Sequence, residues 1–175
     1  MAISQDNLKS KSNNFSYLTD GVKLAEESYQ KKRVAFLCHS HKDEQLVKGL
    51  IVIFKENGVD LYVDWMDQSM PEAPNKQTAI KIKERIIKAH LFIFLATANS
   101  KASRWCPWEI GYADGVNKNI YIVPTTDGYN TYGNEYLELY AKIDSGTFKI
   151  DGKPGYFVTR ANESNGYSIS NDRLI

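Results

Sequence analysis

Residues 104–115, which read RWCPWEIGYADG, gather side chains that could form a small-molecule pocket. The segment holds two of the chain's three tryptophans, one of its two cysteines and one glutamate, Glu109. Trp105 and Glu109 are four residues apart, so they share one face of a helix. Such a glutamate could complement the dipole of a helix start, and Trp105 could be core packing. The same pair could instead supply a negative charge in a dry cavity, where electrostatic effects are strong.

Four short apolar runs indicate the strands that would position this segment. Each has the length of a strand and is rich in β-branched and aromatic residues. Their near-continuous apolarity is typical of strands buried on both faces of a parallel sheet. The runs are VAFLC (34–38), VDLYVDW (59–65), LFIFLAT (91–97) and IYIVP (120–124).

Helical patterns fill the gaps between these runs. Residues 43–57 and 76–90 carry apolar side chains every three or four positions, which predicts two amphipathic helices. A third helix is predicted to begin near Ser103 and to end at Gly115, with Pro107 in its first turn, where amides lack an intrahelical partner. The alternation of strand and helix predicts an α/β fold with an open sheet and right-handed crossovers.

The start of the first helix carries a capping signal. Ser40 and Asp43 form an S-x-x-D pattern, which predicts a capping box in which the hydroxyl and the carboxylate satisfy backbone amides. Ser40 could act as a helix cap, as a ligand contact or as both.

The chain length of 175 residues predicts one domain with a sizeable core. Residues 1–32 are polar and are interpreted as an N-terminal extension that is partly helical, with residues 21–33 as the candidate helix. The domain itself is predicted over residues 33–175, with a tyrosine-rich C-terminal extension from about residue 127. Within that extension, residues 134–143 are predicted to form a short amphipathic helix, and TFKI and GYFVT are predicted to form a hairpin around DGKPG.

Composition argues against several classes of function. The chain has 22 basic and 21 acidic residues, a net charge of +1, so there is no electrostatic case for nucleic acid or an anionic membrane as a partner. No run of about 18 apolar residues predicts a membrane span, and the N-terminal stretch lacks the apolar region of a secretory signal. Cys38 and Cys106 form neither a metal-binding nor a CxxC pattern, so we expect no metal site and a reduced, cytoplasmic protein.

Polar residues follow the predicted strands at their carboxyl ends, where ligands bind in open parallel sheets. If the Trp105–Glu109 face looks over these ends, Glu109 meets the loop of His39 and Ser40 across a cleft. His39 could also be an ordinary surface histidine, and Cys106 has no evident activating partner, which favours a small buried hydrophobe. The strand ends carry Cys38-His39-Ser40, Asp64-Trp65 and Thr97-Ala98-Asn99.

Three segments, in this order, resemble the landmark regions of bacterial TIR (Toll/interleukin-1 receptor) domains. They are FLCHSHKD (36–43), YVDWMDQSMP (62–71) and WCPWEIGYADG (105–115). The resemblance runs from about Val34 to about Thr126. It implies a flavodoxin-like open parallel sheet of about five strands flanked by helices, the TIR fold. It also makes the second segment a BB-like loop and the third the helix of a W-x-x-x-E pair. Cys38 departs from the family, whose first loop often has serine there.

The resemblance implies an enzyme that cleaves the nicotinamide–ribose bond of NAD⁺, as NAD⁺ nucleosidase or cyclase. By motif match the catalytic residue is Glu109, NAD⁺ is the substrate, and no cofactor or metal is expected. Nicotinamide leaves as a neutral molecule, so no general acid is required, and the oxocarbenium-like transition state needs a nearby negative charge. The expected substrate-binding residues are His39, Ser40, Asp64, Trp65 and Trp105.

Further expectations concern the pathway and the partners. Similar TIR proteins act in Thoeris-like antiphage defence, which favours an ADP-ribose-derived, cyclic product that signals to a downstream effector protein. We expect self-association through the BB-like loop, residues 65–75, and a phage-derived trigger. Two alternatives remain open from the sequence: a non-catalytic TIR interaction module, and an enzyme like the nucleoside deoxyribosyltransferases, which also use a glutamate on ribose.

Overall fold

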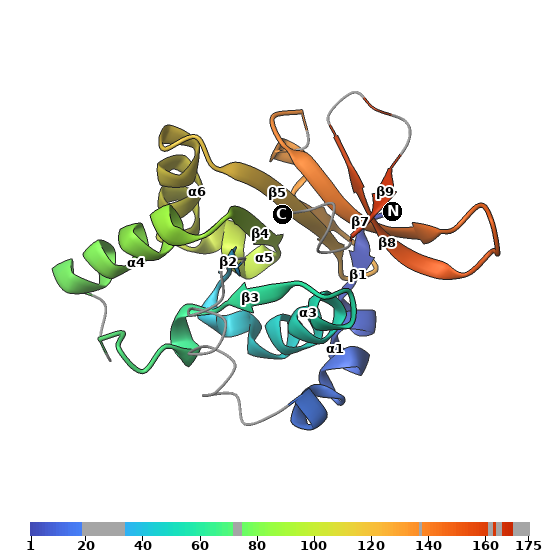
Figure 1. The fold of residues 1–175 in the computed structure, drawn as a ribbon, viewed down its shortest axis with the longest axis horizontal. Coiled ribbons are helices and arrows are strands. Elements are labelled where there is room, and N and C mark those ends of the chain that lie inside the picture. Colours follow the sequence, from blue (N-terminus) through green and yellow to red (C-terminus); the bar gives the residue numbers. More distant parts are fainter. Residues whose placement is uncertain (19–33, 72–74, 137, 161–162, 164–165, 170–175) are drawn as a thin grey trace.

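The computed structural model describes residues 1–18, 34–71, 75–136, 138–160, 163 and 166–169. The candidate helix at residues 21–33 lies outside them. The described residues form one nine-stranded sheet with helices on both faces (Figure 1).

Five parallel strands form the centre of the sheet. Counted among themselves along the chain, they lie in the order second, first, third, fourth and fifth, which is the flavodoxin-like order. The predicted fold class, an open parallel sheet of about five strands, is therefore confirmed. In sheet order the strands are β3 (Asp60–Tyr62), β2 (Val34–Cys38), β4 (Leu91–Ala96), β5 (Asn119–Thr126) and β7 (Ala141–Thr147).

Four further strands join the sheet, two of them beyond β7 and two at the end of β5. β8 and β9 continue it with antiparallel pairing, whereas β1 and β6 pair with the last residues of β5. They span Pro154–Thr159 (β8), Tyr167–Ser168 (β9), Ile3–Ser4 (β1) and Thr131–Tyr132 (β6).

Helices cover both faces because successive residues of the central strands point to opposite sides. Ala35 and Leu37 of β2 join the core cluster that packs against α1 and α3, whereas Val34, Phe36 and Cys38 join the cluster that packs against α4 and α6 (Figure 1). This explains the continuous apolar runs of the strands. The helices are α1 (Gln5–Ser12), α3 (Glu44–Glu56), α4 (Lys76–Lys88), α5 (Ala98–Ala102) and α6 (Cys106–Gly115), and the 3-10 turns are η1 (Phe15–Leu18), η2 (His41–Asp43), η3 (Asp64–Met66) and η4 (Asn134–Tyr136).

The four predicted strands and three predicted helices are present, with differences at their ends. The second strand stops at Tyr62, and the 3-10 turn η3 takes up residues that were expected to extend it. The short helix α5 was not predicted. The β7–β8 pairing confirms a hairpin with GYFVT in its second strand, but the first strand lies earlier than predicted: of TFKI, only Thr147 belongs to β7, opposite Pro154.

The prediction of an amphipathic helix at residues 134–143 is wrong. Only the turn η4 is helical there, and β7 already begins at Ala141. Ala141 pairs with Tyr121 of β5, and Ile143 is fully buried in the core beside Val158 of β8. Pairing with two neighbouring strands therefore outweighs the weak helical pattern.

Residues 1–18 contribute to the packed domain. Ile3 and Leu8 are fully buried in the same core cluster as α3. The side chain of Leu8 reaches that core because α1 lies directly on α3, where Gly49 has no side chain to separate the helices. This part of the expected polar extension is thus held by strand pairing through β1 and by helix packing through α1.

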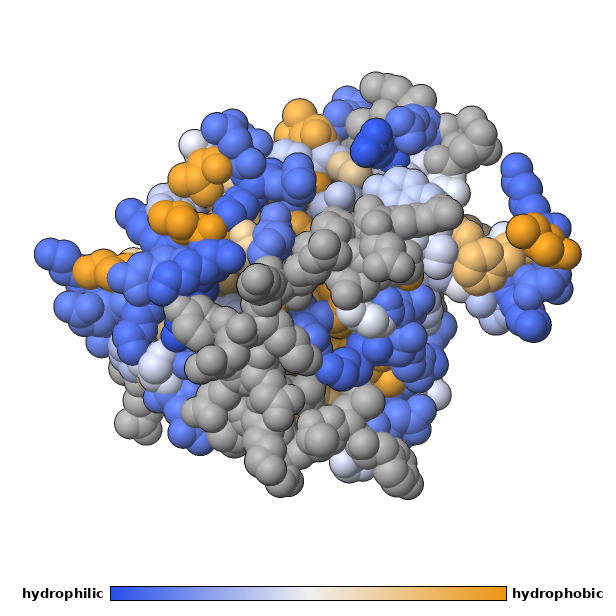
Figure 2. Space-filling model, in the orientation of Figure 1, coloured by the Kyte–Doolittle hydropathy of each residue, from blue (hydrophilic) through white to orange (hydrophobic). Residues whose placement is uncertain are grey.

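Surface hydrophobic residues lie in small, separate groups on the face shown in Figure 2. Orange groups lie over the α4 and α6 side and at the tip of the β7–β8 hairpin, where Ile150 is exposed. No helix among the described residues is long and apolar enough to cross a membrane.

We expect Gly49→Ala to destabilise the protein by about 1–3 kcal/mol, the usual cost of overpacking a core. The added Cβ would overlap the backbone carbonyl of Leu8, so α1 would have to move away from α3. Thermal unfolding followed by circular dichroism measures the effect. Gly111→Ala is the matched control, because a Cβ there meets no atom within 4 Å. If Gly49→Ala and Gly111→Ala have the same melting temperature, α1 does not pack on α3 as described.

Candidate active site

A cavity of about 280 Å³ lies at the carboxyl ends of β2, β3 and β4. This is where ligands bind in open α/β sheets, because the chain leaves neighbouring strands in opposite directions there. Five of the six residues predicted for the site line it: Glu109, His39, Ser40, Asp64 and Trp105. Trp65 does not line it. The lining residues that sequence reasoning missed are His41, Lys42, Thr78, Ile82, Asn99, Ala102 and Ser103.

Glu109 lies in the first turns of α6 with its carboxyl group turned away from solvent. The residue is 5% exposed, and the Cys38 thiol, which donates to the backbone carbonyl of Cys106 (3.8 Å), lies near its carboxyl group. Burial raises the pKa of Glu109 to about 8, and the nearby charge of Asp64 adds to this rise. A glutamate placed only to complement a helix dipole would be exposed and ionised at neutral pH. The geometry of Glu109 favours a role inside the cavity instead.

Trp105 forms one wall of the cavity and is supported from behind by other aromatic rings. Its ring meets that of Trp108 edge to face, with centroids 5.5 Å apart, and Trp108 in turn stacks on Tyr112 at 6.1 Å. The Lys83 ammonium lies over both of these outer rings, at 5.6 and 5.2 Å from their centroids. The indole of Trp105 is therefore held in place beside Glu109.

Ser103 fixes the start of α6. Its hydroxyl accepts hydrogen bonds from the backbone N–H groups of Trp105 (3.1 Å) and Cys106 (3.3 Å). These amides have no intrahelical partner at a helix start. The cap therefore orients the turn that carries Trp105 and precedes Glu109.

The predicted capping box of Ser40 and Asp43 is wrong. The Ser40 hydroxyl accepts only a long hydrogen bond from the Lys42 N–H, at 3.4 Å, and Asp43 makes no side-chain cap at the start of α3. The buried Asp43 carboxylate instead accepts hydrogen bonds from the Thr97 hydroxyl (2.6 Å) and the Asn99 amide (2.7 Å). Asp43 therefore ties the loop after β2 to the loop after β4, a long-range contact that a local sequence pattern does not reveal.

Two histidines meet Asp64 at the same edge of the sheet. His41 Nε2 lies 3.0 Å from one Asp64 oxygen, and His39 Nε2 lies 3.5 Å from the other. Burial alone would raise the pKa of Asp64, but the His41 hydrogen bond and the two imidazoles outweigh burial and lower it. Burial lowers the pKa of His39, whereas the bond to Asp64 raises that of His41. Asp64 is thus the ionised carboxylate of the cavity.

Trp65 lies beside this group and belongs to the core. The Trp65 and His39 rings meet edge to face, with centroids 6.4 Å apart. The Trp65 side chain also packs against the core cluster that includes α3. Sequence adjacency to Asp64 suggested a ligand contact, but the 3-10 turn η3 rotates Trp65 away from the cavity.

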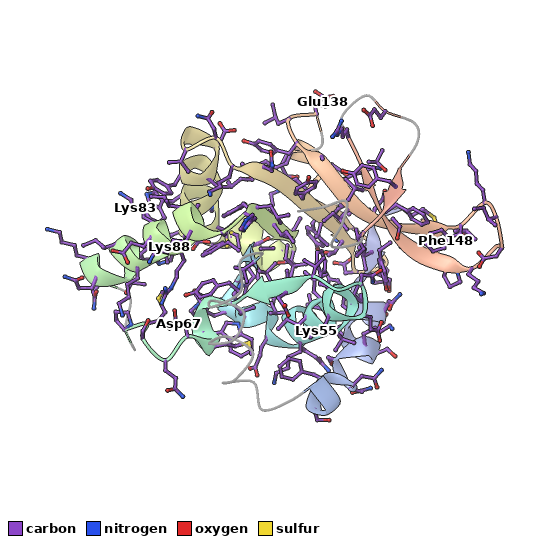
Figure 3. All side chains as sticks on the ribbon, viewed as in Figure 1. Lys55, Asp67, Lys83, Lys88, Glu138 and Phe148 are labelled. Carbon is purple, nitrogen blue, oxygen red and sulfur yellow. The ribbon has the colours of Figure 1, made fainter. Side chains whose placement is uncertain are left out.

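The described part of the BB-like loop is anchored to α4. Asp67, labelled in Figure 3 near the end of β3, accepts hydrogen bonds from the Tyr62 hydroxyl (2.8 Å) and the Arg85 guanidinium (3.0 Å). Lys81 donates to the carbonyl of Ser69. These contacts fix the first half of the loop next to the cavity.

Comparison with known proteins agrees with this arrangement. A family model described as TIR domain matches residues 35–147. The "Probable 3' cyclic ADP-D-ribose synthase ThsB'" of Bacillus cereus (strain MSX-D12) is 33% identical over 135 residues, which cover 72% of this chain and 69% of that protein. The "Putative cyclic ADP-D-ribose synthase TIR2" of Cytobacillus dafuensis is 27% identical over 110 residues, which cover 60% of this chain and 29% of that protein.

We expect Asp43→Ala to destabilise the protein by about 2–3 kcal/mol, because it leaves the buried Thr97 hydroxyl and the Asn99 amide without their acceptor. Ser40→Ala should lower stability by less than about 1 kcal/mol, since it removes one long hydrogen bond. Urea unfolding of both variants measures the difference. An equal loss of stability in Asp43→Ala and Ser40→Ala would support a capping box and contradict the observed contacts of Asp43.

Proposed function

This chain belongs to the TIR domain family, and we propose that it is an enzyme that cleaves the nicotinamide–ribose bond of NAD⁺ and makes a cyclic ADP-ribose product. Two similar proteins are named as cyclic ADP-D-ribose synthases. The observation that carries the proposal is the buried carboxyl of Glu109, which faces a cavity at the strand ends beside a fixed indole.

The charge of Glu109 performs the proposed chemistry. As the bond between nicotinamide and ribose breaks, positive charge develops on the ribose, and nicotinamide departs without needing a proton. A carboxylate held near that ribose stabilises the charge, and the exclusion of water by Trp105 strengthens the attraction. A hydroxyl group elsewhere on the ADP-ribose can then attack the cation and lose its proton to solvent, which gives a cyclic product.

Substrate binding also favours the reactive form of Glu109. With a pKa of about 8 the carboxyl is mostly protonated in the free protein at neutral pH. The nicotinamide ring of NAD⁺ carries a positive charge, so its arrival favours the carboxylate and releases a proton. We infer that kcat/KM rises with pH up to about 8.

The remaining lining residues are proposed to hold the substrate. Trp105 packs against the nicotinamide end, while His39, Ser40 and Asp64 contact the ribose from the strand ends. Trp65 supports His39 from behind rather than touching the substrate. NAD⁺ is a substrate here, and no cofactor takes part in the proposed reaction.

A single copy of the chain supplies only part of the proposed site. A cavity of about 280 Å³ is slightly smaller than the roughly 300–1,000 Å³ of pockets that hold drug-sized ligands, and a dinucleotide is larger than such a ligand. We propose that a second copy completes the site through the BB-like loop, residues 65–75. The described part of this loop lies beside the cavity and presents exposed side chains, among them Gln68 and Ser69.

The wider setting is also a proposal. The protein acts in the cytoplasm, responds to a phage-derived trigger, and signals through its nucleotide product to an effector protein. Incubation of purified protein with NAD⁺, followed by chromatography and mass spectrometry, tests the reaction itself. Release of nicotinamide with a cyclic product supports the proposal, whereas an intact NAD⁺ pool would point to an interaction module and transfer between deoxynucleosides to a deoxyribosyltransferase.

Glu109→Gln should lower the rate of nicotinamide release at least about a hundredfold, since it keeps the size of the side chain but removes the charge. Glu84→Gln, on the exposed side of α4, is the matched control and should retain full activity. Chromatographic quantification of nicotinamide over time provides the measurement. Full activity of Glu109→Gln would show that its carboxylate plays no part in the reaction.

The stability of Glu109→Gln separates loss of charge from loss of fold. The folded pKa of Glu109 is about 8 and its ordinary value is 4.5, so the folded protein holds this proton more tightly than the unfolded chain. Its contribution to stability is therefore present below about pH 4.5 and is lost as pH rises to about 8. Because glutamine does not titrate, the melting temperature of the variant should exceed that of the wild type by more at pH 9 than at pH 6.

Specific activity should rise with protein concentration if a second copy completes the site. Gln68→Lys places a charge in the BB-like loop and should lower activity most at low protein concentration. Gln45→Lys makes the same change at an exposed position of α3 and should leave the dilution curve unchanged. Constant specific activity across a wide dilution series of a monomeric protein would contradict self-association.

A further inference from the structure

His39, His41 and Asp64 form a compact group of metal-ligand side chains. One ligand atom from each lies within 4.8 Å of the others. The group lies at the edge of the cavity, and all three residues line it. Two imidazoles and a carboxylate are the ligand types that zinc and similar divalent transition metals prefer.

The orientation of His39 points to a cation. Its side chain is 1% exposed, and Nδ1 lies 3.1 Å from the carbonyl oxygen of Leu37, so Nδ1 carries the proton and donates it there. Nε2 then presents a lone pair. That nitrogen exposes less than 1 Å² and has no hydrogen-bond partner among the described residues, although it faces an Asp64 oxygen at 3.5 Å. A lone pair facing a carboxylate is unfavourable, and either a second ring proton or a metal ion between the two atoms relieves this.

A histidine that binds a metal commonly donates its other ring N–H to a backbone carbonyl, which fixes the ring. The bond from His39 to Leu37 has this form. It holds Nε2 toward Asp64 before any ligand arrives, so the site is oriented by the end of β2.

The distances suit a small divalent ion. Ligand atoms at about 2.0–2.1 Å from one tetrahedral ion lie roughly 3.3 Å apart. The two observed nitrogen–oxygen distances, 3.5 Å for His39 and 3.0 Å for His41, bracket this value, although they run to different oxygens of Asp64. Because the three ligand atoms lie within 4.8 Å of one another, a small movement of the side chains would bring them around one ion. The ion would replace the proton between His41 and Asp64. His41 is accessible for this exchange, because its side chain is 66% exposed.

We propose that His39, His41 and Asp64 bind a divalent transition-metal ion of the zinc type at the edge of the cavity, and that the bound ion inhibits the enzyme. Three protein ligands leave a fourth position open toward the cavity. Inhibition rests on the proposed function: a doubly charged cation there opposes the cationic nicotinamide end of the substrate and the positive charge that develops on the ribose.

Binding is tested without reference to catalysis, by titrating the purified, metal-free protein with Co²⁺ and Zn²⁺. We expect one Co²⁺ per chain with the visible absorption of a tetrahedral ion, and displacement by Zn²⁺ in calorimetry. His41→Ala and Asp64→Asn should each weaken Zn²⁺ binding by about tenfold or more, since even residues that only orient a ligand contribute about 10–100-fold. His41 is largely exposed, so its substitution leaves the core intact.

The third histidine of the chain, His90, provides the matched control, because it is exposed and does not line the cavity. His90→Ala should bind Zn²⁺ as the wild type does. Absence of binding, binding that His41→Ala and Asp64→Asn leave unchanged, or a near-ultraviolet thiolate band showing that Cys38 or Cys106 holds the ion would each overturn the site.

Inhibition is tested separately by measuring nicotinamide release with and without Zn²⁺. Lower activity in the wild type and in His90→Ala, with a higher Zn²⁺ concentration needed for His41→Ala, supports the inhibitory role. Unchanged activity with the metal bound would overturn inhibition while leaving the enzyme assignment intact. A protein that binds the metal but never releases nicotinamide would instead overturn the proposed function and keep the site.

Discussion

Removal of the Glu109 carboxyl group from water is the constraint on which the rest of the cavity depends. A carboxylate is expensive to bury without a cation, so in the free protein burial pushes its pKa to about 8 and the group is mostly neutral at pH 7. The neighbours of Glu109 accordingly include a thiol and an apolar surface: Cys38, whose thiol donates to the Cys106 carbonyl, and the indole of Trp105. Lys42 also lines the cavity, but burial decides the direction of the Glu109 pKa shift. A carboxyl group that burial keeps protonated suits a substrate that brings its own positive charge.

The fold produces this environment through contacts between loops that are distant in the sequence. Asp43 links the loop after β2 to the start of α5, and Ser103 then caps α6, so the position of Glu109 follows from the end of β4. The Cys38 end of β2 lies beneath Glu109 because β2 and β4 pair in parallel, with Cys38 opposite Phe94. Positioning therefore comes from the sheet register and from the hydrogen bonds of Asp43 and Ser103.

Local sequence patterns predicted the strands and helices correctly where apolar residues recur at a regular spacing. Burial of a strand on both faces requires a continuous apolar run, which predicted the strands at residues 34–38 and 91–97. Burial of one stripe of a helix requires an apolar residue every three or four positions, which predicted the helix at residues 76–90. The rule that ligands bind beyond parallel strand ends then placed Glu109 and His39 correctly at one cavity. The prediction failed where a distant partner decided the outcome. Asp43 prefers Thr97 and Asn99 to its own helix, and residues 141–143 pair with neighbouring strands.

The two carboxyl groups of the cavity show how one fold keeps acids in different states a short distance apart. Asp64 receives a hydrogen bond from His41 and lies beside His39, so its pKa falls despite burial. Burial raises the pKa of Glu109, and the charge of Asp64 raises it further. Environments that separate the pKa values of neighbouring acids are how active sites assign distinct roles to them. Asp64 is thus ionised at the cavity edge beside two imidazoles, and in the proposed reaction Glu109 becomes charged when the cationic substrate enters. This coupling also explains why the sequence alone did not reveal the histidine group: His41 acquires its role only because η3 brings Asp64 to it from another strand.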